Sequence, residues 1–242
     1  MDKIEGRNPV IEALKGKRKI EKILIQEGIK GGKIEEIINA AKKKGIRIER
    51  VPRTKLDQIA SSHSHQGIIA YAEEKELVSP MDIVNYAREK DEPPFIVILD
   101  QIQDPQNFGA IIRTAYAAGA HGVIYQDKRA AGITPVVVKS SAGAIEHIKL
   151  SEVKNINHTI EELKEAGLWI AGADMEGDML YYEVDLKGPI GLVIGSEGKG
   201  LRRLVRENCD FLVKIPMPGE FSSLNASVAA AILIYEVLRQ RQ

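Results

Sequence analysis

The second half of the chain alternates short apolar runs with amphipathic stretches. The predicted strands are FIVILD, GVIYQ, HIKLSEV, LWIAGAD, GLVIG and FLVKIP, and helical patterns separate most of them. Strands that are apolar throughout are typical of a parallel sheet with helices on both faces, because neither side of such a strand meets water. The pattern therefore predicts an α/β fold with a parallel sheet for residues 95–242, ending in a long apolar helix.

The first part of the chain has shorter elements of both kinds. Helices are predicted over VIEALK, with Asn8 as N-cap and Pro9 at the first helical position, and over IEEIINAAKKK and TKLDQIA. KILIQ, IRIERV and GIIAYAE have the pattern of strands. This order predicts a small αβα sandwich. Ser79 and Pro80 predict the start of one more helix, MDIVNYAREK, which DEPP ends.

Charge separates these two parts further. The whole chain carries 34 basic and 34 acidic residues, so its net charge is zero. Residues 1–72 nevertheless carry 16 basic against 9 acidic side chains, whereas residues 73–94 carry 3 against 7. A basic domain can bind nucleic-acid phosphates, although surface lysines also serve solubility. We therefore predict a basic domain at 1–73, a linker at 74–94 and a larger domain at 95–242.

Composition excludes several classes of protein. The apolar runs are too short to cross a bilayer and no charged-then-apolar leader opens the chain, so a soluble cytoplasmic protein without a membrane anchor is expected. Cys209 is the single cysteine, which rules out an internal disulfide. The five histidines have no metal-ligand spacing, and we expect no metal site.

Three segments at predicted strand ends contain the candidate chemistry. They are LDQIQDPQNFGAIIRTAYAAG (99–119), GLVIGSEGKGL (191–201) and IPMPGEFSSLNASVAAA (215–231). Ligands of open α/β sheets bind at the carboxyl ends of strands, where these segments begin. Each has an ordinary alternative. Ser222 or Ser223 could simply cap the last helix, Arg113 could be solvated, and the glycine turn matches neither a P-loop nor a dinucleotide pattern.

Taken together and in this order, the three segments closely resemble the motifs of the SpoU, or TrmH-type, family of RNA ribose 2'-O-methyltransferases. DPQNFGAIIRTA resembles the first motif, GLVIGSEGKGL the second and IPMPGEFSSLNASVA the third. The basic N-terminal domain, with GRNPVIEAL and HQGI, is similar to the ribosomal-protein-like RNA-binding domain of the subgroup that modifies a 23S rRNA guanosine. One position departs from the family, since Ala226 replaces a common valine in the third motif.

The resemblance implies a deep trefoil knot in the C-terminal domain, an obligate homodimer and an S-adenosylmethionine cofactor. It implies that the cofactor is held by Gly195, Ile215 and Leu224, with Ala173 and Met217 as weaker candidates. The implied catalytic residues are Arg113, Asn107, Glu197, Ser223 and Asn225. Because deprotonating a guanidinium is very costly, we expect Arg113 to orient RNA and stabilise developing negative charge rather than act as a base.

In the N-terminal domain, Arg7, Asn8 and His65 are the candidates for RNA contact. His63 and His65 are predicted in a polar loop, which could equally be a plain solvated turn.

The expected activity is methyl transfer from S-adenosylmethionine to the ribose 2'-hydroxyl of a guanosine in 23S rRNA. Two alternatives remain within the family: a tRNA D-loop guanosine as the substrate, and an RNA-binding homologue that has lost catalysis. An NAD-dependent oxidoreductase is a weaker alternative because the dinucleotide fingerprint is missing.

Overall fold

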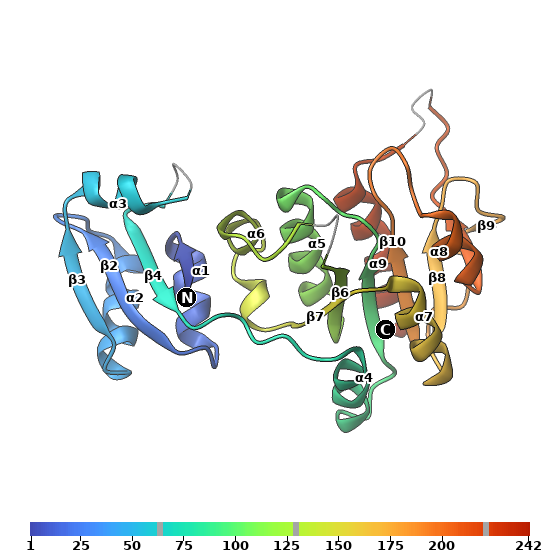
Figure 1. The fold of residues 1–242 in the computed structure, drawn as a ribbon, viewed down its shortest axis with the longest axis horizontal. Coiled ribbons are helices and arrows are strands. Elements are labelled where there is room, and N and C mark those ends of the chain that lie inside the picture. The colour runs from blue at the N-terminus through green and yellow to red at the C-terminus, as the bar shows by residue number, and fades with distance from the viewer. Residues whose placement is uncertain (62–64, 128–130, 220–222) are drawn as a thin grey trace.

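The computed structural model describes residues 1–61, 65–127, 131–219 and 223–242. Its ribbon has two bodies side by side, an N-terminal one (blue to cyan) and a larger C-terminal one (green to red), joined by an extended segment that leads into helix α4 (Figure 1). Among the described residues, no helix is long and apolar enough to cross a membrane.

The N-terminal domain is a mixed four-stranded sheet with helices on both faces. Its strands are β1 (Asp2–Glu5), β2 (Ile20–Gln26), β3 (Arg47–Val51) and β4 (Ile68–Ala72), in the order β1-β4-β2-β3. Its helices are α1 (Arg7–Lys15), α2 (Gly32–Lys43) and α3 (Arg53–Ile59). Alternate strand residues face opposite sides, so Ile23 and Ile25 belong to the same buried cluster as α1 and α2, whereas Leu24 packs with Leu56 of α3.

Two details of this domain differ from the predictions. Strand β1 was not predicted, because four residues give too little alternation to detect. The prediction of Asn8 as the N-cap of α1 was wrong: the helix begins at Arg7, and its N-cap is Gly6, with φ of 101° and no side-chain capping bond. The Asn8 side chain instead accepts a hydrogen bond from Lys33 Nζ at 2.7 Å.

The C-terminal domain contains the predicted parallel sheet. Its strands are β5 (Phe95–Leu99), β6 (Gly122–Gln126), β7 (Lys149–Val153), β8 (Trp169–Ala173), β9 (Met179–Leu180), β10 (Ile190–Ile194) and β11 (Phe211–Lys214). They lie in the order β7-β6-β5-β10-β8-β11-β9, and every pairing is parallel. The α/β class is thus confirmed, while the trefoil knot stays a prediction.

Helices cover both faces of this sheet. They are α4 (Pro80–Glu89), α5 (Pro105–Ala117), α6 (Pro135–Ser140), the 3-10 turn η1 (Ala144–Glu146), α7 (Ile156–Glu165), α8 (Arg203–Asn208) and α9 (Ala226–Arg241). Phe95, Val97 and Leu99 pack towards α5, α6 and α9, whereas Ile96 and Ile98 pack towards α4, α7 and α8. Strands buried on both sides explain the uninterrupted apolar runs in the sequence.

We expect the buried His121, which directly precedes β6, to make the stability of this domain sensitive to acid. Its Nδ1 accepts a hydrogen bond from Phe95 N at 3.0 Å, and its Nε2 lies 2.9 Å from Glu92 Oε2. Burial lowers the pKa of His121 below its usual 6.5. The unfolded chain therefore takes up this proton more readily than the folded one, so the stabilising contribution present above pH 6.5 is lost as the pH falls below it.

We expect His121→Asn to reduce this acid sensitivity, because an asparagine oxygen can accept from Phe95 N but does not titrate. Urea unfolding between pH 7.5 and 5 measures it, and the free energy of unfolding should fall less in the variant than in the unaltered protein. The matched control is His158→Asn, since His158 is 67% exposed. Identical pH profiles for His121→Asn and the unaltered protein would contradict this assignment.

Candidate active site

Three neighbouring strands end at the edge of the C-terminal sheet where the candidate cofactor residues lie. Ala173 is the last residue of β8, Gly195 follows β10, and Ile215 follows β11. These strands are adjacent and parallel, so the three positions share one edge although they are distant in sequence. Ile215 and Ala173 are half-buried and pack against the apolar core.

A compact polar cluster joins the three motif segments. Asn107 Nδ2 donates to Glu197 Oε1 at 2.7 Å, and Asn225 Nδ2 donates to the same oxygen at 2.5 Å and to Asn107 Oδ1 at 3.1 Å. The backbone N–H of Ala226 also points to Glu197 Oε1, at 3.4 Å. We call Asn107, Glu197 and Asn225 the amide–carboxylate cluster. One carboxylate oxygen thus ties the starts of helices α5 and α9 to the glycine turn.

Helix capping places the two amides. Asp104 caps α5 by accepting from Gln106 N at 3.0 Å, with Pro105 in the first turn, and this puts Asn107 at the third helical position. Asn225 caps α9, since its Oδ1 accepts from Ser227 N at 3.0 Å, which leaves its Nδ2 for the cluster. The alternative that Ser223 caps α9 is therefore wrong. Ser222 lies outside the described residues.

The glycine turn carries Glu197 to this position. Ser196 and Gly200 exchange two backbone hydrogen bonds of 3.1 and 2.9 Å, which close the turn. Gly198 and Gly200 have φ of 75° and 64°, in the left-handed region that glycine adopts without strain. A Cβ on Gly195 would lie 2.5 Å from Leu201 N, so only glycine fits there.

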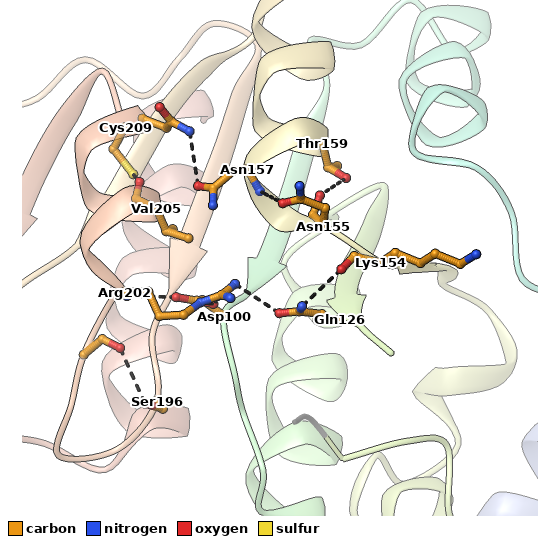
Figure 2. Close-up of polar contacts among 12 residues, drawn as sticks. Asp100, Gln126, Lys154, Asn155, Asn157, Thr159, Ser196, Arg202, Val205 and Cys209 are labelled. Atoms are coloured by element: carbon orange, nitrogen blue, oxygen red, sulfur yellow. Dashed lines mark hydrogen bonds and ion pairs between the residues drawn. The ribbon is translucent and has the colours of Figure 1, made fainter. Parts of the chain in front are cut away.

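The residues that anchor this turn were not among those predicted from the sequence. The fully buried Asp100 accepts from Arg202 N at 2.9 Å and Arg202 Nε at 2.7 Å, and Arg202 Nη2 donates to Gln126 Oε1 at 3.0 Å. Figure 2 shows Asp100 and Arg202 facing each other, with Gln126 next in the chain of contacts. One sequence signal was available: Asp100 directly follows the apolar strand FIVIL. A carboxylate buried there needs a partner, since an unpaired buried charge is costly.

Two hollows border the amide–carboxylate cluster. One, of about 370 Å³, is lined by the cluster residues Asn107 and Glu197 together with Gln103 and Lys199. The other, of about 490 Å³, is lined by Asn107, Asn225 and the outer surfaces of α5 and α6, including Lys139 and Ser140. Among the described residues, no group of His, Cys, Asp or Glu is arranged to hold a metal ion.

The remaining candidates are not joined to the cluster. Arg113 is exposed on α5 and has no polar partner within the described part of the chain. Ser223 is exposed, and Leu224 and Met217 are half-buried near the ends of the third segment. The structure therefore brings three of the five predicted catalytic residues into contact and leaves Arg113 and Ser223 facing outwards.

A separate hollow of about 790 Å³ collects the N-terminal candidates. It is lined by Arg7, Asn8, Lys33, Arg53 and His65, among others. His65 lies in a loop, as predicted, but the alternative of a plain solvated turn is wrong for this residue, because it is only 2% exposed. Its Nδ1 accepts from Gly67 N at 3.0 Å and its Nε2 lies 2.8 Å from Asp57 Oδ1. His63 lies outside the described residues.

Both parts of the chain match known protein families. Residues 94–235, which include all three elements of the cluster, match the family described as "SpoU rRNA Methylase family". The chain belongs to the SpoU methylase family. Residues 3–78 of this SpoU methylase chain match "RNA 2'-O ribose methyltransferase substrate binding".

Individual relatives cover nearly the whole SpoU methylase chain. YacO of Bacillus subtilis (strain 168), named as a TrmH family tRNA/rRNA methyltransferase, is 48% identical over 240 residues, which are 99% of this chain and 96% of YacO. The SpoU methyltransferase AviRb from Streptomyces viridochromogenes, solved with the cofactor AdoMet, has a TM-score of 0.80 at 27% identity and covers 99% of this chain and 89% of its own. An AdoMet-bound rRNA methyltransferase from Sinorhizobium meliloti has a TM-score of 0.82 at 26% identity, covering 100% and 88%.

Proposed function

We propose that this protein transfers a methyl group from S-adenosylmethionine to the ribose 2'-hydroxyl of a guanosine in 23S ribosomal RNA. The observation that carries the proposal is the amide–carboxylate cluster, in which one oxygen of Glu197 joins all three motif segments. A protein that only bound RNA would not need two side-chain amides to converge on one carboxylate oxygen beside the strand ends.

The strand-end residues fit the cofactor. Gly195 follows β10 at this edge of the sheet, and because it has no Cβ the backbone of Gly200 and Leu201 can fold closely against it. Ile215 and Leu224 are half-buried apolar side chains suited to enclosing a purine, and Ala173 and Met217 would complete the wall. When bound there, the cofactor supplies an electrophilic methyl group on a sulfonium.

The cluster and Arg113 would then act on the RNA. The 2'-hydroxyl must approach in line with the methyl group and lose its proton, and its oxygen gains negative charge on the way. Arg113, charged and without a polar partner in the described part of the chain, is free to contact a phosphate or this oxygen. Asn107, Glu197 and Asn225 would hold the ribose in position, and Ser223 lies exposed beside them in the chain.

The N-terminal hollow would bind RNA away from the reacting ribose. The basic side chains of Arg7, Lys33 and Arg53 line it and can contact phosphates, with Asn8 beside them. The buried His65 would shape this hollow through Asp57 and Gly67 rather than extend into solvent. Helix α3, which carries Arg53, lies at the same upper edge of the molecule as the start of α5 in Figure 1, so one RNA could reach both sites.

A homodimer is part of the proposal. Val228 and Tyr235 of α9 are 47% and 49% exposed, and Ile232 lies between them on the same side of the helix. Such an apolar stripe favours burial against a second copy. Sedimentation at two concentrations tests it, and a monomer throughout would contradict it.

Two measurements test the activity. Titration calorimetry with S-adenosylmethionine should detect binding, whereas a purely RNA-binding homologue would show none. Mapping of ribose methylation in rRNA and tRNA after gene deletion should show one 23S guanosine without its methyl group. Loss from a tRNA D-loop guanosine would instead support the tRNA alternative, and no loss from either RNA would reject the substrate proposal.

A further inference from the structure

The interface between the two domains contains a buried group of charges. The Arg18 guanidinium of the N-terminal domain donates to Glu146 Oε1 of η1 at 3.0 Å, to the Asp2 carboxylate, and to the carbonyl of Glu73 at 2.5 Å. The side chains of Arg18 and Glu146 are only 6% and 1% exposed. Buried opposite charges of this kind resist separation, because moving one leaves the other without a partner.

Further contacts surround this ion pair. Lys75 Nζ donates to the Glu146 carbonyl at 3.3 Å, and burial lowers the pKa of Lys75, as expected for an ammonium group largely removed from water. Nearby, His147 Nε2 lies 2.9 Å from Glu12 Oε2, and its ring stacks on Tyr116 of α5 with the centroids 5.3 Å apart. The contacts therefore link the N-terminal domain to both η1 and α5.

Steric fit adds to these charges. Gly143, just before η1, has φ of 94°, and a Cβ on it would lie 2.5 Å from the Cβ and Cγ of Glu12. Buried apolar residues of the two domains also belong to one connected cluster, which includes Leu14 of α1 and Ile145 of η1. Charge, shape and apolar contact together specify one placement of the N-terminal domain.

Helix α6 connects this interface to the amide–carboxylate cluster. It leads into η1 and packs on α5 so closely that a Cβ on Gly109 would lie 2.7 Å from Val137 O. Ser140 Oγ of α6 lies 2.8 Å from Val136 O of its own helix and 3.2 Å from Pro105 O, two residues before Asn107 in the first turn of α5. Figure 1 shows α6 between the N-terminal domain and α5. A rigid interface between the two domains therefore holds the N-terminal hollow at a fixed distance from the amide–carboxylate cluster.

We propose that Arg18 and Glu146 are positioning residues for the RNA substrate, because their buried ion pair holds the RNA-binding hollow in register with the methyl-transfer site on α5. The proposal rests on the proposed function, in which one RNA contacts both domains. Neither residue touches the cofactor or the reacting ribose. Their loss should therefore weaken the use of RNA while leaving cofactor binding intact.

The change to make is Arg18→Met, which keeps an aliphatic stem and removes the guanidinium. Two binding surfaces on a mobile connection act at a lower effective concentration than two held rigidly, so KM for RNA should rise by about tenfold to a hundredfold. The cofactor Kd and kcat at saturating RNA should change less than about threefold. Arg18→Lys retains the charge and should recover part of the KM, which a general loss of folding would not reproduce.

The domain spacing can be measured without any activity. Spin labels on Asn39→Cys of α2 and Glu165→Cys of α7 occupy exposed positions on the two domains. The native Cys209 should label slowly, because burial raises the pKa of its thiol to about 12. Excess unlabelled chain is added so that each measured distance lies within one labelled copy. In Arg18→Met the buried Glu146 carboxylate has lost its partner, so the distribution of label-to-label distances should be roughly twofold broader or shifted.

The matched control is Lys164→Met, which removes a 2.7 Å ion pair with Asp210 inside the C-terminal domain. It should change neither the spacing nor KM. If Arg18→Met does not fold, Glu146→Gln provides the same test with the side-chain shape retained. An unchanged distance distribution together with an unchanged KM would overturn the proposal. If the unaltered protein methylates no RNA but Arg18→Met still changes the label-to-label distance, the proposed function is refuted, while the role of Arg18 in the domain contact still holds.

Discussion

Replacing Glu197 by alanine is expected to lower kcat for methyl transfer by roughly 100-fold, since a displacement of about 1 Å in a reacting group has an effect of this size. In the folded protein, one Glu197 oxygen accepts from Asn107, Asn225 and the backbone of Ala226. The alanine variant leaves all three donors without this acceptor, so the starts of α5 and α9 are no longer tied to the glycine turn. Single-turnover kinetics with saturating RNA and cofactor measure the loss.

The control for charge is Glu197→Gln, whose amide oxygen can still accept hydrogen bonds. A position that matters mainly for geometry should retain at least a tenth of the rate in this variant, whereas a requirement for negative charge should make it as slow as alanine. Asn107→Ala combined with Glu197→Ala should cost little more than either change alone, because both break the same cluster. Fully additive losses would show that the two residues act independently.

The main architecture of this protein could be predicted because its sheet is buried on both faces. Phe95 to Leu99 are apolar at every position, and the structure uses both sides of the strand. Strands β1 and β9 could not be predicted in this way, since four and two residues do not establish a pattern. The N-caps were ambiguous for another reason. Asn8 and Asn225 are both of a residue type that favours the N-cap, but only Asn225 caps a helix. Asn8 binds Lys33 instead, and Gly6, with its positive φ, takes the N-cap position of α1.

The candidate site was predictable only as far as its residues belong to the three motif segments. Asn107, Glu197 and Asn225 meet in space as three linked hydrogen-bond partners. Asp100 and Arg202 were missed because the pairing of a strand-end carboxylate with an arginine 102 positions away depends on the chain path, which periodicity does not contain. The contacts of the buried His65 with Asp57 and Gly67 depend in the same way on the path of the chain.

Replacing Arg113 by alanine should have at least as large an effect on catalysis with almost none on folding. Its side chain is exposed and has no polar partner in the described ranges, so the free energy of unfolding should change by less than about 0.5 kcal/mol. Loss of a charge that stabilises a developing alkoxide typically lowers kcat by about 10²–10³-fold. The measurements are urea unfolding, calorimetric binding of S-adenosylmethionine and single-turnover methylation.

Arg113→Lys separates the two roles available to this side chain. Lysine keeps the positive charge but lacks the planar pair of donors that binds a phosphate with two hydrogen bonds. If Arg113 acts mainly as a charge near the reacting oxygen, the lysine variant should recover most of the rate. If it orients a phosphate through two hydrogen bonds, the rate of the lysine variant should remain close to that of the alanine variant.

Because Arg113 lies six residues beyond Asn107, about a third of a turn round the helix and about 9 Å along it, it must act from beside the cluster rather than within it. An alanine variant that methylates RNA at the full rate, with normal cofactor binding, would remove Arg113 from the mechanism altogether.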